Sequence, residues 1–328
     1  MKLTVKEIKY VLSNDIDVSG EVDAKDIDSL VFLCIEASKD ALNKAVPPGY
    51  SDFERDQIVH MVDGLRHSHS SIRKLLRGEQ NPSAVDALTI SRLQLETLYV
   101  FCFLLQSPDN VRLYLKNGWK KKYIRYILHR EECRDLPRFD KYFGEVSIPF
   151  EVSIPFIDGL QKLCLVSDEE RRTINIEELG APFGPEPKRV AIPKFPTPMA
   201  VIEKINNPSQ ASMLKRLYPE YQFLCSFAHG DSEATLLKTV ADKRSIASTM
   251  FTTGQIEDFY QKHILEPPIL YSALSAIQVS TEIAAIYKSD IELLAKVTKA
   301  WIFLLNMSLL AAPIWEIRAK KILPLITL

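Results

Sequence analysis

Two charged side chains interrupt a long apolar stretch of the sequence. Between Ala87 and Pro108 the only charged residues are Arg92 and Glu96, and most of their neighbours are apolar. Residues four apart lie on one face of an α-helix, so the two should form a pair. A charge on an apolar helix is costly unless it is paired. The pair therefore either fixes the packing of the helix or holds an arginine in a cleft, where it can bind phosphate or carboxylate while Glu96 orients a partner.

A second stretch, residues 218–230, carries side chains that would complete such a site. Tyr221, Ser226 and His229 occur there, and Gly230 favours a helix end directly after the histidine. The helix dipole favours the protonated form of a histidine in the last turn. Beside an arginine and a glutamate, this histidine could serve in general acid–base chemistry. The alternative is a core histidine bonded to a carbonyl or to Glu96. The candidate catalytic residues are therefore Arg92, Glu96, Tyr221, Ser226 and His229.

The two motifs together resemble a known family. An apolar helix with Arg-x3-Glu, followed by a Y-x4-S-x2-H pattern that begins at Tyr221, is similar to the mostly bacterial helical family called domain of unknown function 5677, over about residues 84–310. That family implies a helical fold and carries no established activity. The chain more distantly resembles helical ribonucleases of the HEPN type, which place an Arg-x4–6-His motif on a bundle helix. This resemblance implies RNA cleavage, although no arginine lies four to six residues before His229.

An acidic segment near the start, DIDVSGEVDAKD at residues 15–26, resembles the calcium-binding loop of an EF-hand. Oxygen donors at alternate positions converge on one hard cation in such a loop, and Gly20 occupies the position of the sharp turn. Asp26 stands where that loop has a bidentate glutamate, and its shorter reach should weaken binding. The alternative is an acidic turn in which Asp23 or Asp26 caps the next helix. The candidate metal ligands are Asp15, Asp17, Ser19, Glu21, Asp23 and Asp26.

The elements that must position these residues are mostly helices. We expect a mostly α fold, a helical bundle with a Pro-rich, partly extended insertion at about 144–200. The insertion contains EVSIPF twice in tandem, at 145–150 and 151–156, and its alternation of apolar and polar residues predicts short strands or extended edges. Apolar residues recur at helical spacing over about 24–45, 52–77, 83–106, 109–134, 209–229, 269–288 and 290–311.

The domain organisation follows from these elements. We expect an N-terminal helical hairpin around the acidic loop at 1–48, and a bundle domain over 49–328 that the insertion interrupts. The uncharged stretch 300–315 is short for a membrane span and contains a proline, so a buried core helix is the preferred interpretation.

The composition narrows the function classes. The 328 residues are 46% hydrophobic and 25% charged with a net charge of -1, which excludes a disordered chain and is far less basic than a protein that coats nucleic acid. The five cysteines are widely spaced and form no CxxC, which argues against a disulfide framework or a structural zinc site. The first residues lack the apolar run of a signal peptide, so we expect a cytoplasmic protein.

Two hypotheses for function remain open. In the first, the protein is an enzyme that cleaves RNA: Arg92 binds an anion, Glu96 orients a partner, and His229 is the acid or base. In the second, the protein is a non-catalytic interaction module with a protein partner. The Arg92, Glu96 and His229 side chains would then form a structural network, and calcium at the N-terminal loop would modulate the partner site.

Overall fold

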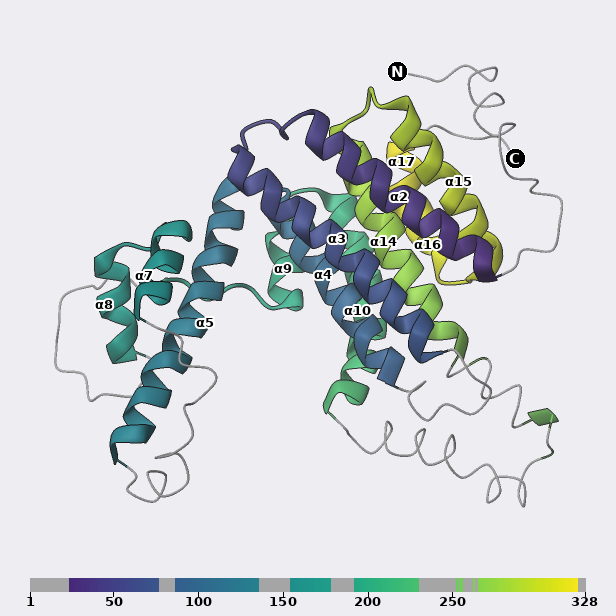
Figure 1. Cartoon of the computed structure of the whole chain (residues 1–328). Helices are drawn as coiled ribbons and strands as arrows, with labels where there is room; N and C mark the ends of the chain where they lie inside the picture. The colour runs from purple at the N-terminus through teal and green to yellow at the C-terminus, as the bar shows by residue number, and fades with distance from the viewer. Residues whose placement is uncertain are drawn as a thin grey trace. The chain divides into compact units, whose positions relative to one another are not determined.

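The computed structural model describes residues 24–76, 86–135, 154–177, 192–229 and 265–323, together with positions 252, 254, 255 and 262. Helices account for nearly all of these ranges, and no strand occurs in them (Figure 1). The expected mostly α class is therefore confirmed. The chain divides into two compact units: unit 1 comprises Met1–Gln106 and Thr197–Leu328, and unit 2 comprises Ser107–Pro196.

Unit 1 is a helical bundle around α14. Helix α14 packs on α2, α3, α4 and α15, and α10 packs on α4. In the order of the chain its helices are α2 (Ala24–Lys44), α3 (Asp52–Leu75), α4 (Asp86–Leu104), α9 (Pro198–Lys204), α10 (Pro208–His229), α14 (Glu266–Ile286), α15 (Ile291–Met307), α16 (Ala311–Ile314), the π-helical turn η3 (Trp315–Ala319) and α17 (Lys320–Ile322).

Local sequence signals explain where several helices begin. Helix α3 starts at a capping box, in which the Ser51 hydroxyl accepts from the Glu54 N–H and the Glu54 carboxylate accepts from the Ser51 N–H. The Asp290 carboxylate accepts from the Leu293 N–H and caps α15 in the same way. Prolines occupy the first turn of α14, where a helix needs no N–H donor. These signals act over three or four residues, and they match the expected boundaries closely.

Helices α4 and α14 are the apolar centre of unit 1. Both are long and apolar enough to cross a membrane by length and composition, but 61% and 72% of their most apolar windows are buried inside the protein. The core helix of a soluble protein has the same properties, so this is weak evidence for a membrane. The stretch 300–315 that we considered from the sequence spans the end of α15, a break at Ser308 and α16.

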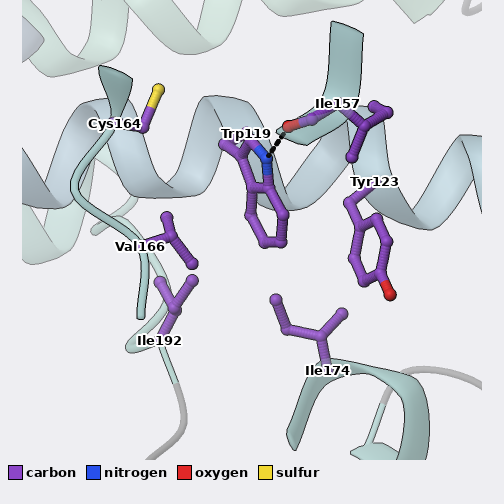
Figure 2. Packing of buried hydrophobic residues seen from close by; sticks show 7 residues of the cluster. All are labelled: Trp119, Tyr123, Ile157, Cys164, Val166, Ile174 and Ile192. Atoms are coloured by element: carbon purple, nitrogen blue, oxygen red, sulfur yellow. Dashed lines mark hydrogen bonds between the residues drawn. The ribbon is translucent and has the colours of Figure 1, made fainter. Parts of the chain in front are cut away.

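Unit 2 is built around Trp119 of α5 (Pro108–Asp135). The two short helices α7 (Ile154–Leu163) and α8 (Asp168–Glu177), and the segment at 192–196, bring apolar side chains to it. Figure 2 shows the indole N–H of Trp119 directed at the Ile157 carbonyl oxygen, 3.1 Å away. The Trp119 ring also stacks on Tyr123 with the ring centroids 4.8 Å apart. The buried members of this cluster are Trp119, Tyr123, Ile157, Cys164, Val166, Ile174 and Ile192.

The expected insertion differs from unit 2 in two respects. Unit 2 begins at Ser107 rather than near 144, because α5 supplies the tryptophan on which the later segments pack. The second EVSIPF copy does not end in a strand: α7 begins at Ile154, with Pro155 in its first turn. Helical spacing brings Ile157, Gln161 and Cys164 to the buried side, and this packing outweighs the local alternation. The first copy lies outside the described residues.

Candidate functional site

The residues of the predicted polar cleft come from α4 and α10 of unit 1. The Arg92 guanidinium lies 3.0 Å from the Glu96 carboxylate and donates to the Tyr221 hydroxyl at 3.2 Å. Its Nε donates to the Cys225 sulfur at 3.4 Å, and its Cζ lies 5.6 Å from the centroid of the Tyr221 ring. The structure therefore brings together Arg92, Glu96 and Tyr221 from the predicted set. Cys225, a neighbour of Tyr221 one helical turn away, is an addition.

The charges of this cluster balance within the protein. Burial disfavours the charged form of Arg92, but hydrogen bonds to Cys225 and Tyr221 and the nearby Glu96 carboxylate together raise its pKa above the ordinary value. Burial raises the pKa of Tyr221 to about 12, so its hydroxyl stays protonated near neutral pH. A neutral phenol and a permanently charged guanidinium are not general bases, which leaves the Glu96 carboxylate, paired with Arg92 at 3.0 Å, as a proton acceptor in this cluster.

The other two predicted residues of α10 lie apart from the guanidinium. The Ser226 hydroxyl donates to the Phe223 carbonyl of its own helix at 2.7 Å and is buried. His229 is exposed at the end of α10, and the described residues offer it no hydrogen bond or ion pair.

Helix direction explains the separation of His229 from Glu96. The Tyr99 hydroxyl donates to the Leu214 carbonyl while Arg92 reaches Tyr221, so α4 and α10 run antiparallel. Moving along α10 towards His229 therefore means moving along α4 away from Glu96. Because Arg92 and Tyr221 lie level with each other, the eight residues from Tyr221 to His229 and the four from Arg92 to Glu96 add up. At 1.5 Å per residue, His229 and Glu96 are roughly 18 Å apart along the helix axes.

The predicted calcium loop lies outside the described residues, apart from its last positions. Helix α2 begins at Ala24, so Asp26 falls in its first turn, although its side chain is not described. Within the part of the chain that the structure describes, no group of three or more His, Cys, Asp or Glu side chains could hold a metal ion.

A buried chain of hydrogen bonds in unit 1 was not anticipated from the sequence. On α3, the His69 Nδ1 lies 2.6 Å from the Ser272 hydroxyl of α14, and its Nε2 lies 2.9 Å from the Asp28 carboxylate of α2. Arg73 pairs with the second oxygen of Asp28 at 2.6 Å. Ser, His and Asp in this order can activate a nucleophile. His69 and Ser272 are fully buried, however, and a substrate would have no route to them. These hydrogen bonds instead connect the three helices α2, α3 and α14.

A buried ion pair lies elsewhere in unit 1. The Arg318 guanidinium of η3 donates to both oxygens of Glu282 on α14, at 2.9 and 2.6 Å. Gln210 and Gln278 donate to the same carboxylate at 2.9 and 2.7 Å. The sequence does carry a signal for this pair: Glu282 is the only charged residue from 267 to 287, as Arg92 and Glu96 are the only ones between Ala87 and Pro108.

An open pocket of about 280 Å³ lies in unit 2, between α5, α7 and the segment at 192–196. Gly118 lines the pocket, and no neighbouring atom lies within 4 Å of the position that a Cβ would take there. Asn117 holds the segment in place by donating to the Pro193 carbonyl and accepting from the Phe195 N–H. The pocket is lined by Tyr114, Leu115, Asn117, Gly118, Trp119, Lys121, Lys122, Leu160, Cys164 and Phe195.

The pocket combines an apolar interior with a positive edge. Lys121 and Lys122 are exposed, and neither forms an ion pair with any described residue. Burial raises the pKa of the Cys164 thiol, which is therefore an apolar wall rather than a thiolate. The pocket beside these lysines depends on α7, which lies far from them along the chain.

Comparison of the chain with family models, with curated proteins and with solved structures finds no match.

Proposed function

We propose that this protein is a non-catalytic interaction module, in which unit 1 is a helical scaffold and the pocket of unit 2 receives a ligand. The observation that carries the proposal is the open, apolar pocket edged by two lysines without an ion-pair partner among the described residues. Protein binding sites are typically concave and mostly apolar, with a few polar groups that set orientation.

The geometry of Arg92 supports a structural role for the predicted cleft. Its charge is met by Glu96 at 3.0 Å, and its remaining contacts are with Tyr221 and Cys225 of the neighbouring helix. A phosphate would have to compete with that carboxylate at close range. These contacts support a structural role for the cluster as a clamp between α4 and α10, although His229, which the predicted network included, takes no part in them.

RNA cleavage has less support because its acid or base, His229, is exposed and distant from Glu96. We expect RNA to remain intact when incubated with a high concentration of the purified chain. Cleavage that is retained through purification and lost in His229→Ala would overturn the proposal in favour of a ribonuclease.

The pocket itself is tested with anilinonaphthalene sulfonate, an apolar anion whose fluorescence rises in a dry environment. We expect saturable enhancement with the wild-type chain and its loss in Gly118→Leu, because Gly118 lines the pocket and a leucine there would fill open space beside it. Gly64→Leu is the matched control: Gly64 is also an exposed glycine in a helix with no atom within 4 Å, but it lies on α3. Circular dichroism of each variant verifies that binding reflects the folded chain.

A further inference from the structure

We infer that the pocket of unit 2 binds an acidic segment of a partner protein that inserts one large apolar side chain. This inference rests on the proposed function, since it requires the pocket to be a binding site. Three features of the surface around the pocket carry it: an apolar stripe on α7, a strained and exposed leucine at the end of that helix, and two lysines of α5 that have no ion-pair partner among the described residues.

The apolar stripe extends the pocket along α7. Phe156, Leu160 and Leu163 are spaced at i, i+4 and i+7, so they share one face of the helix. Leu160 lines the pocket, while Phe156 and Leu163 are 51% and 53% exposed. An apolar stripe longer than the pocket itself suits a peptide segment better than a compact small molecule.

The leucine that follows this stripe is held in an unfavourable backbone conformation. Leu165 has φ of 54° and is 58% exposed. It occupies the left-handed position of the α7 C-terminus, where the Val166 N–H donates to the Gln161 carbonyl at 3.0 Å. Glycine is the usual residue there, because in this conformation a Cβ lies too close to the following carbonyl oxygen and costs free energy. A large apolar side chain displayed at that cost, directly after the pocket residue Cys164, is consistent with a contact surface.

The charges around the pocket select an acidic partner. Two acidic side chains of unit 2 are already engaged: Glu170 pairs with Lys116 at 2.7 Å, and Asp158 pairs with Arg171 at 2.6 Å. Lys121 and Lys122 remain without such a partner among the described residues. The Lys122 ammonium lies 5.9 Å from the centroid of the Phe156 ring, at the border between the apolar stripe and solvent. Carboxylates on either side of an apolar anchor would meet both lysines.

Two other ligand classes fit the pocket less well. Single-stranded nucleic acid needs aromatic faces that are free for base stacking. Here Trp119 and Tyr123 are buried and stack on each other. The exposed rings of Tyr114 and Phe156 already meet Phe195 and Lys122. A volume of about 280 Å³ lies just below the range of about 300–1,000 Å³ for small-molecule sites, and the pocket is open rather than enclosed. A fatty acid would therefore leave much of its chain in water.

The inference is tested by displacement of anilinonaphthalene sulfonate from the intact chain. The competitors are short peptides with a central Phe, Leu or Trp between glutamates, the same peptides with a central Ser, and the same peptides with lysines in place of glutamates. We expect only the apolar, glutamate-flanked peptides to displace the dye. In direct binding of the labelled Phe peptide, Lys121→Glu with Lys122→Glu should weaken affinity by about tenfold or more. The matched control is Lys215→Glu with Arg216→Glu, an adjacent exposed basic pair on α10, which should leave affinity unchanged.

The outcomes separate this inference from the proposed function. If the dye binds and Gly118→Leu abolishes binding, but decanoate or an RNA oligonucleotide displaces it and no acidic peptide does, the pocket is a binding site and the inference about its occupant is wrong. If dye binding is absent, or Gly118→Leu binds as the wild type does, the proposed function itself fails. Equal binding of glutamate-flanked and lysine-flanked peptides also overturns the acidic partner.

Discussion

Arg318 and Glu282 meet in the interior of unit 1 through two N–H···O bonds, at 2.9 and 2.6 Å. Their side chains are almost completely buried, and the pair connects the C-terminal π-helical turn to the central helix α14. Arg318 also donates to the Ser209 hydroxyl at the start of α10. The nearby Cys102 thiol has its pKa raised well above the ordinary value, first by burial and then by Glu282. This pair, rather than Arg92 and Glu96, is therefore the buried ionic centre of the bundle.

Removing one partner of this pair should be strongly destabilising. We expect Arg318→Met to lower the free energy of unfolding by about 3–5 kcal/mol, because it leaves a buried carboxylate without its countercharge. Lys320→Met, two residues on, is the control: Lys320 pairs with Glu316 in an exposed position and should cost less than about 1 kcal/mol. Urea unfolding measures the free energy of unfolding of both variants. Similar small losses of stability in the two would contradict the role of Arg318 and Glu282 as the buried ionic centre.

Two histidines of α3 provide a matched test of the buried hydrogen-bond chain. His69 is fully buried between Asp28 and Ser272, whereas the side chain of His67 is 75% exposed. We expect His69→Ala to cost about 3 kcal/mol, since it opens a cavity and removes a hydrogen-bond partner from the Ser272 hydroxyl and from one oxygen of Asp28. His67→Ala should stay within about 0.5 kcal/mol. Thermal unfolding distinguishes the two variants. An unchanged melting temperature in His69→Ala would show that the hydrogen bonds of His69 do not hold the helices together.

We expect the contacts of Arg92 to contribute to the stability of the protein rather than to an activity. Arg92→Ala removes contacts with Glu96, Tyr221 and Cys225, and we expect a loss of about 1–2 kcal/mol. His229→Ala should remain within about 0.5 kcal/mol, because His229 is exposed. Unchanged or raised melting temperature in Arg92→Ala would instead indicate a preorganised functional site.

Alkaline pH should destabilise the protein through buried tyrosines. Burial is the main cause that raises the pKa of Tyr221 and of Tyr287 from 10.0 to about 12. A raised pKa in the folded state favours the protonated form, so this stability is fully present below pH 10 and is lost as the pH rises to about 12. Urea midpoints should therefore fall across this interval. The fall should be smaller in Tyr287→Phe, and a flat profile in the wild type would contradict the expectation.

Calcium binding at residues 15–26 stays a prediction from the sequence. Calorimetry should detect weak binding by the intact chain, because Asp26 reaches less far than a bidentate glutamate. A variant with Asp15→Ala and Asp17→Ala should show no heat. The absence of heat from the wild-type chain would leave the acidic turn as the only interpretation of this segment.

Short-range signals in the sequence accounted for much of the fold. Pro47, Pro48 and Gly49 separate α2 from α3, and Pro108 separates α4 from α5, because proline lacks the N–H donor that a continuing helix needs. The spacing of Arg92 and Glu96 likewise predicted their pairing, since residues four apart in one helix are neighbours whatever surrounds them. Helix positions and pairs within a helix are thus determined locally.

Contacts between distant segments required the tertiary structure. Whether His229 or Tyr221 reaches Arg92 depends on the antiparallel arrangement of α4 and α10. The spacing of residues within either helix does not predict that arrangement. The second EVSIPF copy enters a helix because burial against Trp119 outweighs a local pattern that also suits a strand. The contacts of Asp28 with His69, and the pocket at Gly118, arise in the same way. These contacts are stabilised by the burial of groups that lie far apart along the chain, so they are determined only by the tertiary structure.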